Sequence, residues 1–469
     1  MKSMFNGGCA NPVYEPEPDL MTFTHNEKRA LVNPRIGGWA VVSNKEFVQL
    51  LRVKQPLPRR LGEEAYRCGL ARKNGQSVFA GGVYEDVLFF ELHISDECNL
   101  ACRYCSSGTR PVGTITKVDP QLGLKWVDRV DEYARQHSMR NLILEFTGGE
   151  PLANVEYLDH IIGYAIATFG KDICPKIIIV TNLTILGPRQ IELLHKYPVI
   201  LSVSLDGDRA DHDAQRRFAS GTPTWNVVVN NIRKLADQGL PPETLQTTIT
   251  SQTVDRMTDT VRLLMDMGYT HLALQHMASA GAPPGSHYLK PDPCVFVEKL
   301  FQVFSEQFIP FWRATGVMPY ARHLTVCYAY LLEPKRTYMC QSSPCGAGKN
   351  IICTKGNGDV FGCATGPWDE ELRYGNILRD SFEVCQRSPA ATASASRHVS
   401  ALPKCASCLW RGWCHGGCPK EAYSATGSIF EPSASCELHQ RLFRRALESI
   451  IDNEFPEQAI REEAKYYLK

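Results

Sequence analysis

Between about Gly82 and Phe308, short apolar segments alternate with longer amphipathic ones, which is the pattern of repeated strand–helix units. The segment that follows the fourth apolar run, VVVNNIRKLADQG, ends at Gly239, as helices often do. The predicted strands are residues 87–95, 141–148, 176–182, 199–207, 244–251 and 270–277. Consecutive units of this kind predict an α/β fold, a parallel sheet curling into a partial, TIM-like (β/α)6 barrel. Its chemistry is expected at the carboxyl ends of the strands.

The size and charge of the chain restrict its function only loosely. Its 469 residues are about three times the commonest domain size, so we expect two or three domains. The 51 basic and 50 acidic residues nearly cancel, so no overall field attracts nucleic acid or an anionic membrane. No run has the length of a signal peptide or of a membrane span of about 18 apolar residues. We therefore expect a cytoplasmic protein that binds neither nucleic acid nor membrane.

The 18 cysteines are unusual for such a chain, because a reducing compartment does not favour disulfides. Metal or cluster ligation is the leading explanation. Some cysteines are scattered, and these we expect to be small buried hydrophobic residues. They are Cys9, Cys68, Cys174, Cys294 and Cys385.

Three cysteines follow the first predicted strand directly, in the segment ISDECNLACRYCSSG. Cys98, Cys102 and Cys105 thus lie at the edge of the sheet where active sites are built. Three thiolates on one short loop can hold three irons of a [4Fe–4S] cluster and leave the fourth iron open. Zinc is the alternative, although structural zinc is usually held by four ligands from paired knuckles.

This C-x3-C-x2-C spacing, with Tyr104 before the last cysteine, resembles the cluster loop of the radical S-adenosylmethionine (SAM) superfamily. The resemblance extends over the strand–helix units. It implies that SAM chelates the open iron and is cleaved reductively to methionine and a 5′-deoxyadenosyl radical, which abstracts a substrate hydrogen. The protein would hold the radical near one C–H bond and exclude other hydrogen donors.

Residues at later strand ends also resemble SAM-binding positions of that superfamily. Gly148, Gly149 and Glu150 are similar to the segment that receives the methionine amine, where the absence of side chains lets carbonyls approach. Ser204 and Asp206 resemble the segment near the ribose and carboxylate. The remaining SAM contacts implied are Tyr104, Asn182 beside Thr181, and Arg216 of the H-D-x-x-R segment, for which Arg217 could substitute.

The last third of the chain is rich in cysteine and glycine and has little periodicity. Its spacings resemble the SPASM domain of radical SAM enzymes that modify peptides, which carries two auxiliary [4Fe–4S] clusters. The glycine-flanked GDVFGC segment is typical of a hairpin that turns a ligand back toward a cluster. The resemblance assigns the first cluster to Cys340, Cys345, Cys363 and Cys418, and the second to Cys405, Cys408, Cys414 and Cys436.

Alternatives to this assignment stay open. Cys353 competes with Cys340, and a pair of zinc ribbons would also suit the C-x2-C spacing. Eight ligands would saturate two auxiliary clusters and leave no iron for substrate. Residues 387–402 are expected to form a loop or linker.

One departure from the resemblance bears on the reaction. Sulfatase-maturing relatives carry an aspartate that serves as a base directly after the cysteine at position 363, whereas this chain has Ala364. Sulfatase maturation is therefore disfavoured. A general base must come from elsewhere, and no residue of the sequence is singled out for that role.

The N-terminal segment differs in character from the rest. Residues 29–42 predict two strands around a Gly-Gly turn, followed by a helix with Ser43 as N-cap and then a second helix. This order resembles the winged-helix module related to the pyrroloquinoline-quinone chaperone, which binds leader peptides and offers them a strand edge. The alternative is an extension that only packs on the barrel.

These parts predict five regions: a tail (1–24), a winged-helix-like leader-peptide module (25–82), a radical SAM core (83–310), a SPASM domain (311–445) and a C-terminal helix (446–469). We expect a maturase that installs a thioether or carbon–carbon cross-link in a ribosomally made peptide or small protein. It would use SAM and three [4Fe–4S] clusters, with flavodoxin or ferredoxin as electron donor. In length and layout the chain is similar to the maturase of the quinohemoprotein amine dehydrogenase small subunit.

Two other functions are weighed against this one. The first is a radical SAM enzyme that acts on a small molecule, for which the N-terminal module would be dispensable. The second is a non-enzymatic iron–sulfur or zinc scaffold that binds partners through that module.

Overall fold

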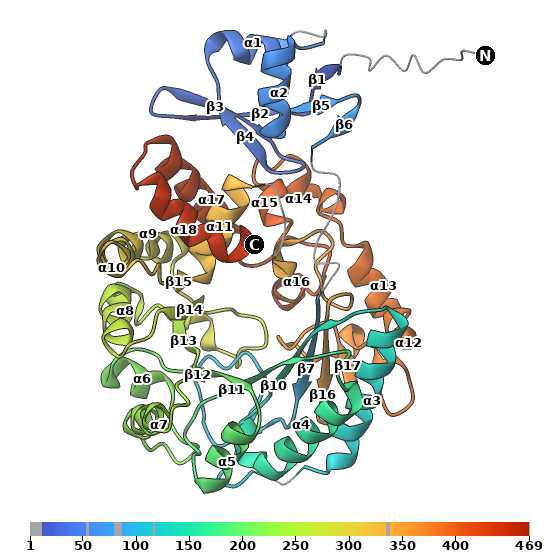
Figure 1. Ribbon diagram of the computed structural model, residues 1–469, viewed down its shortest axis with the longest axis vertical. Helices are drawn as coiled ribbons and strands as arrows, with labels where there is room; N and C mark the ends of the chain where they lie inside the picture. Colours follow the sequence, from blue (N-terminus) through green and yellow to red (C-terminus); the bar gives the residue numbers. More distant parts are fainter. Residues whose placement is uncertain (1–11, 53–55, 79–86, 116–117, 334–337, 469) are drawn as a thin grey trace, which may run out of the picture.

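The computed structural model describes residues 12–52, 56–78, 87–115, 118–333 and 338–468. Its centre is a ten-stranded sheet in the order β15-β14-β13-β12-β11-β10-β7-β16-β17-β18 (Figure 1). Neighbouring strands from β15 to β16 are parallel, and the β16–β17 and β17–β18 pairs are antiparallel. The strands are β7 (Val87–His93), β10 (Asn141–Thr147), β11 (Lys176–Thr181), β12 (Val199–Ser204), β13 (Thr244–Ile249), β14 (His271–His276), β15 (Tyr320–Ala321), β16 (Ile351–Lys355), β17 (Asp359–Phe361) and β18 (Gly375–Asn376).

The predicted strands are all present, as β7 and β10 to β14, so the α/β class with a parallel sheet is confirmed. Each strand ends slightly earlier than predicted, which leaves Gly148, Asn182 and Asp206 in loops just beyond the strand ends. Helices follow the strands and lie along the outer side of the sheet (Figure 1). They are α3 (Pro120–Gln136), α4 (Val155–Phe169), α5 (Pro188–Lys196), α6 (Arg209–Gln215), α7 (Trp225–Asp237), α8 (Met257–Asp266) and α9 (Pro293–Val303).

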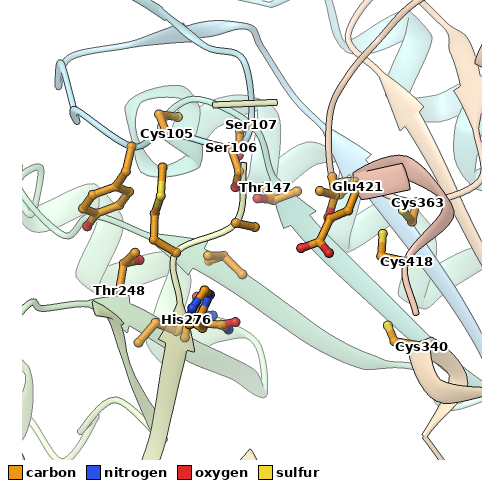
Figure 2. Close-up of a pocket in the computed structure, with 18 of the residues that line it drawn as sticks. Cys105, Ser106, Ser107, Thr147, Thr248, His276, Cys340, Cys363, Cys418 and Glu421 are labelled. Carbon is orange, nitrogen blue, oxygen red and sulfur yellow. The ribbon is translucent and has the colours of Figure 1, made fainter. Parts of the chain in front are cut away.

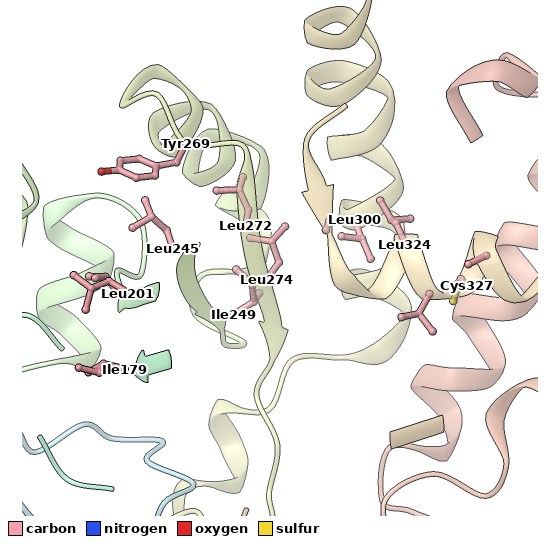
Figure 3. Packing of buried hydrophobic residues seen from close by; sticks show 14 of the residues in the cluster. Ile179, Leu201, Leu245, Ile249, Tyr269, Leu272, Leu274, Leu300, Leu324 and Cys327 are labelled. Atoms are coloured by element: carbon pink, nitrogen blue, oxygen red, sulfur yellow. The ribbon is translucent and has the colours of Figure 1, made fainter. Parts of the chain in front are cut away.

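Apolar side chains on alternate strand positions form the main core with the inward faces of these helices. Helix α3 begins at Pro120 because the Asp119 side chain accepts the backbone N–H of Gln121, and its Trp126 is fully buried. At the β14 side of the sheet, Leu272 and Leu274 lie near Leu300 of α9 and Leu324 of α11 (Arg322–Leu332), as Figure 3 shows.

The sheet does not end at β7, as six strand–helix units alone would suggest. Strand β16 from the cysteine-rich third lies parallel to β7, with Cys353 opposite Glu91. Every residue of β16 is buried, and β17 returns from it around Gly358, whose φ is +88°. The predicted hairpin before Cys363 is therefore confirmed, and it joins the cysteine-rich segment to the central sheet.

Residues 12–24 are not a tail, contrary to expectation. Strand β1 (Tyr14–Pro16) pairs with β5 (Ala71–Lys73), and β2 (Met21–His25) pairs with β3 (Lys28–Asn33). The alternating MTFTH segment buries Phe23, which is why it forms a strand rather than a free end. The predicted strand pair is present as β3 and β4 (Gly38–Val41), and the predicted helices as α1 (Asn44–Arg52) and α2 (Arg59–Arg67). Strand β6 (Gln76–Ser77) completes the β1–β5 sheet.

Ser43 caps α1 as predicted. Its hydroxyl accepts the N–H of Glu46 at 3.3 Å, and the Glu46 carboxylate accepts the N–H of Ser43 at 2.8 Å. These bonds lower the pKa of Glu46 below its usual value.

The N-terminal unit contacts the cysteine-rich third. Trp39 donates to the carbonyl of Leu331 in α11 at 2.8 Å, and the ring of Phe23 packs against Trp410 at 5.7 Å. His25 bonds Asp452 at 2.8 Å, and a Cβ on Gly412 would clash with Gly37. The unit is therefore attached to helices beyond the β/α units (Figure 1).

Two expectations for the last third are wrong. Residues 387–402 contain helix α13 (Pro389–Ser396), because Ser388 caps it, Pro389 suits its first turn and alanines favour helix. The C-terminal segment is not one helix from 446. Instead α17 (Cys436–Ile451) crosses that boundary, and α18 (Glu457–Leu468) follows a turn at Asn453. Within the described residues, no helix combines the length and apolarity needed to cross a bilayer.

The other helices of this third are short. They are α10 (Ile309–Thr315), α12 (Phe382–Gln386), α14 (Pro403–Ala406), α15 (Arg411–Cys414) and α16 (Pro419–Thr426). None of the cysteines that lie in the described residues forms a disulfide. Of the scattered cysteines, Cys385 is buried as expected, Cys68 is half-buried, Cys174 and Cys294 are exposed, and Cys9 lies outside the described residues.

Candidate active site

A cavity of about 540 Å³ opens at the carboxyl ends of the parallel strands. One wall carries the loop of Cys98, Cys102 and Cys105 together with strand-end residues. The facing wall carries cysteines of the last third, and Figure 2 shows Cys105 and Cys363 on opposite sides. The cavity therefore joins the two cysteine-bearing parts of the chain.

The first three cysteines have polar neighbours suited to thiolates. Cys98 Sγ accepts the N–H of Leu100 at 3.4 Å and lies 3.8 Å from Asn182 Nδ2, while Cys102 Sγ lies 3.9 Å from Arg216 Nη1. Burial, above all, raises the pKa of Cys98 and Cys102 to about 12. Bound iron would ionise such thiols outright. The donor set therefore fits an iron–sulfur cluster.

Gly148 and Gly149 line the cavity, and the structure shows why both must be glycine. Gly148 has a φ of +118°, and a Cβ on Gly149 would lie 1.7 Å from the carbonyl oxygen of Glu97. The reason differs from the expected approach of a ligand: the end of β10 packs directly against the backbone of the Cys98 loop.

Glu150 is buried behind the cavity wall. Its carboxylate does not line the cavity but accepts hydrogen bonds from the Thr181 hydroxyl at 2.6 Å and from the N–H groups of Asn182 and Leu152. Burial raises its pKa to about 7. Through these bonds Glu150 holds the ends of β10 and β11 together.

Asp206 is also set back from the cavity. It accepts Arg216 Nε at 2.9 Å, the N–H of Thr248 at 2.9 Å and the hydroxyl of Tyr104. Arg216 and Tyr104 line the cavity themselves, with the guanidinium 5.3 Å from the centre of the ring. Asp206 therefore orients both side chains.

Arg216 and Arg217 have different surroundings, and only Arg216 lines the cavity. Arg217 is on the outside, where it donates to the carbonyl of Gly221 at 3.0 Å. His212 and Asp213 do not face the cavity either: His212 Nδ1 accepts the N–H of Asp206, and Asp213 caps α7. Of the H-D-x-x-R motif, Arg216 alone lines the cavity. Ser204 and Asn182, which were predicted as SAM contacts at other strand ends, line it as well.

The first downstream set of cysteines comes together on the facing wall. Cys340, Cys345, Cys363 and Cys418 all line the cavity. Burial raises the pKa of Cys345 to about 12, and the nearby Cys340 and Cys363 raise it further. Burial also raises the pKa of Cys418, with further contributions from Glu421, Cys363 and Cys345. Cys353 is buried on β16 and is not part of this lining. The geometry therefore groups Cys340, not Cys353, with the other three.

The second set lies apart from the cavity. Burial raises the pKa of Cys405 to about 11, with contributions from the nearby Cys436 and Cys408. Burial also raises the pKa of Cys414, with contributions from the same two cysteines and from Cys405. All four are therefore neighbours. Within the described residues no three His, Cys, Asp or Glu side chains meet at the spacing of a single metal ion. A four-iron cluster is larger and its ligands lie further apart.

Buried Arg397 lies between the two sets. It donates to the carbonyls of Gly416 and Gly417 at 3.1 Å and of Glu431 at 2.9 Å, and its charge interacts with cysteines of both sets. Because its partners are backbone groups on either side of Cys418, Arg397 organises the segment that links the two sets.

Two half-buried acids, Glu91 and Glu145, carry no signal that the sequence analysis used. Glu91 of β7 and Glu145 of β10 are paired in register, and Glu91 lines the cavity and accepts the N–H of Ala364 at 2.6 Å. Burial raises the pKa of Glu91 to about 7 and that of Glu145, which Glu91 also repels, to about 8. The signal was a single acid inside each of two apolar strands, FFELH and LILEF.

Comparison with known proteins identifies the part of the chain that builds this site. Residues 92–264 match the model of the Radical SAM superfamily. This part of the chain belongs to that superfamily. Membership implies one [4Fe–4S] cluster and SAM, and the matched residues include Cys98, Cys102, Cys105 and the strand ends that face them.

Relatives of this radical SAM enzyme include peptide and protein maturases. The chain is 25% identical to an AdoMet-dependent heme synthase of Methanosarcina barkeri over 72% of its length and 93% of the relative. It is 23% identical to a cysteine-type anaerobic sulfatase-maturating enzyme of Clostridium perfringens, over 76% and 95% of the two chains. It is 24% identical to the subtilosin biosynthesis protein AlbA of Bacillus subtilis, over 80% and 74%.

Solved structures share the fold. The structure of anSMEcpe with bound AdoMet superposes with a TM-score of 0.67 and 18% identity, covering 81% of this chain and 99% of the other. SuiB of Streptococcus suis bound to its precursor peptide SuiA covers 91% of this chain and all of the other, with a TM-score of 0.54 and 15% identity.

Proposed function

We propose that this radical SAM enzyme installs a thioether or carbon–carbon cross-link in a ribosomally made peptide or small protein. One observation carries the proposal: a single cavity is lined by Cys98, Cys102 and Cys105 on one wall and by four further cysteines on the other. A substrate held in this cavity would lie between a radical-generating cluster and an electron-accepting one. The SAM-binding cluster would use the first three cysteines.

The two auxiliary [4Fe–4S] clusters would use the two downstream sets of four cysteines. When bound, SAM and its cluster supply a radical that removes one hydrogen atom from the substrate. The protein's own part is to position the groups. Asp206 holds Arg216 and Tyr104 at the cavity wall, and Gly148 and Gly149 let β10 pack against the Cys98 loop.

A cross-link also requires the loss of a proton, and Glu91 is the acid placed to accept it. Its carboxylate lines the cavity beside the turn that follows Cys363, and Glu145 lies next to it on β10. Two neighbouring, half-buried carboxyl groups do not both ionise readily, so the pair is suited to taking up a proton. We therefore assign the role of general base to Glu91, since Ala364 has no group that could accept a proton.

The N-terminal unit is proposed to bind a leader segment, as a winged-helix-like module. Through Trp39 and α11 it is attached to the helices of the cysteine-rich third, and Figure 1 shows it beside α14 and α15. SuiB, which covers most of this chain, has been solved with a precursor peptide. Flavodoxin or ferredoxin is the expected electron donor. Kinship with the quinohemoprotein amine dehydrogenase maturase stays a prediction.

The test is co-expression of the full chain with short peptides encoded near its gene, followed by mass spectrometry. We expect a loss of two hydrogens per cross-link, which the Cys98→Ala variant abolishes. The anaerobically reconstituted protein should hold about twelve irons, four for each cluster. Zinc in place of iron, or modification that survives Cys98→Ala, would rule the proposal out and favour a scaffold.

A small-molecule substrate is the second candidate, because one relative that is matched over 93% of its length is an AdoMet-dependent heme synthase. In that case removal of residues 1–78 should leave substrate turnover unchanged, whereas a leader-dependent enzyme should lose it. Mutating Trp39, which attaches the unit to α11, provides a milder version of the same comparison.

A further inference from the structure

Lys420 is a buried cation beside the first downstream set of cysteines. It lies in α16, two residues after Cys418, and is only 6% exposed. Its ammonium donates to the carbonyl of Cys363 at 3.0 Å and to that of Thr365. It also lies 4.4 Å from the ring centre of Trp368. Lys420 therefore connects the segment of Cys418 to the turn that carries Cys363.

That turn also contacts the loop of the first three cysteines. The N–H of Gly366 donates to the carbonyl of Ser106 at 3.3 Å, and Trp368 Nε1 donates to that of Ser107 at 3.0 Å. Residues 363–368 thus begin at Cys363 on the facing wall and end at Trp368, which contacts the loop just after Cys105. Lys420 anchors this segment at its centre.

A buried charge at such a position has a defined electrostatic effect. Reduction of a cluster adds one negative charge, and a nearby cation in a low-dielectric interior stabilises it. The hydrogen-bond partners of Lys420 are carbonyl oxygens, and no ion pair of Lys420 is among the contacts of the described residues, although its charge interacts with Glu91 of β7. Its ammonium therefore lies next to the turn that carries Cys363.

We propose that Lys420 is a positioning residue for the first auxiliary cluster, holding the Cys363 turn and making that cluster easier to reduce. The inference rests on the proposed function, because it requires a [4Fe–4S] cluster at Cys340, Cys345, Cys363 and Cys418. In the proposed reaction the substrate radical forms the cross-link and loses one electron and one proton. A cluster held by Cys340, Cys345, Cys363 and Cys418 would supply the acceptor for that electron, and Glu91 would take up the proton.

Lys355 is a matched control within the same structure. It is 7% exposed and lies 4.6 Å from the centre of the same Trp368 ring. Unlike Lys420, it forms an ion pair with Asp96 at 2.8 Å, so a neighbouring negative charge offsets its own. Its removal should change the field at the cysteines less than the removal of Lys420.

The experiment is a redox titration of the reconstituted full chain, followed by electron paramagnetic resonance. Replacing Cys98, Cys102 and Cys105 with alanine removes the first cluster and identifies the two auxiliary signals. In Lys420→Met we expect one auxiliary potential to become more negative and the other to stay unchanged. Lys420→Arg and Lys355→Met should both keep potentials near those of the parent.

The inference is overturned if Lys420→Met leaves both potentials unchanged, or if Lys355→Met shifts one of them equally. Lys420→Gln, which keeps a donor without the charge, is the second variant if Lys420→Met does not assemble the cluster. If the cluster assembles in Lys420→Arg but in neither Lys420→Met nor Lys420→Gln, the result supports the need for a cation at this position. If the cluster is absent from all three variants, the inference is overturned. Absence of auxiliary signals from the parent chain would instead contradict the proposed function itself.

Discussion

Glu91 of β7 accepts the backbone N–H of Ala364 at 2.6 Å, across a separation of 273 residues in the chain. The residue after Cys363 is the position at which the sulfatase-maturing relatives are expected to carry a carboxylate. Here a carboxylate reaches the same turn from a strand of the same sheet, because β16 pairs with β7 and continues into the hairpin that precedes Cys363.

Glu91→Gln should slow product formation by about 10²-fold or more, because a general base typically contributes 10² to 10⁴. Cleavage of SAM should continue, since the first cluster loop is untouched. Both are measured together by mass spectrometry of 5′-deoxyadenosine and of the peptide. Glu145→Gln, which changes the neighbour that does not line the cavity, should have the smaller effect. Equal loss of both products in Glu91→Gln would contradict the assignment.

Arg216→Gln should weaken SAM binding by at least tenfold, because a hydrogen bond to a charged group is worth about 1.5–3 kcal/mol. The substitution removes the partner of Asp206 and the N–H group near Cys102. Arg217→Gln is the matched control, since Arg217 contacts an exposed turn. Equilibrium binding of SAM to the reconstituted protein measures both, and equal affinities would show that Arg216 has no part in the site.

Cys340→Ala should lower the iron content from about twelve to about eight per chain, through loss of one four-iron cluster. Cys353→Ala should retain the parental content, because Cys353 is buried on β16 and does not line the cavity. Iron and sulfide analysis after anaerobic reconstitution distinguishes the two. The reverse result would exchange the two cysteines in the assignment.

Gly149→Ala should abolish the first cluster while leaving the auxiliary clusters in place. The added Cβ would lie 1.7 Å from the carbonyl oxygen of Glu97, so the backbone next to Cys98 would have to move. Gly113→Ala is the control, because no atom lies within 4 Å of a Cβ built there. Iron content and SAM cleavage report the outcome, and normal SAM cleavage by Gly149→Ala would refute the packing argument.

Glu463 provides a pH-dependent test remote from the cysteines. Burial raises its folded-state pKa from 4.5 to about 8, although Thr325 donates to it at 2.5 Å. The folded state therefore binds this proton more tightly than the unfolded state, and stability from Glu463 is complete below pH 4.5 and lost as pH rises toward 8. Glu463→Gln should make thermal stability less dependent on pH in that window. The prediction is contradicted if the melting temperatures of parent and variant change with pH in the same way between pH 5 and 9.

The sequence by itself determined the local features of this protein. Strand periodicity located β7 and β10 to β14, and the spacing of Cys98, Cys102 and Cys105 placed a ligand loop at the end of the first of them. Such features depend on neighbouring residues, so they can be predicted without knowing distant contacts.

Only the tertiary structure decided which distant residues share the cavity. The pairing of β16 with β7, the partnership of Glu91 with Ala364 and the choice of Arg216 over Arg217 all depend on how separate segments pack. Glu91 and Glu145 carry no motif, and their proposed role arises because parallel pairing brings them side by side at the cavity, where both are half-buried. Burial and proximity set the chemistry of such acids, and neither is a property of a local sequence pattern.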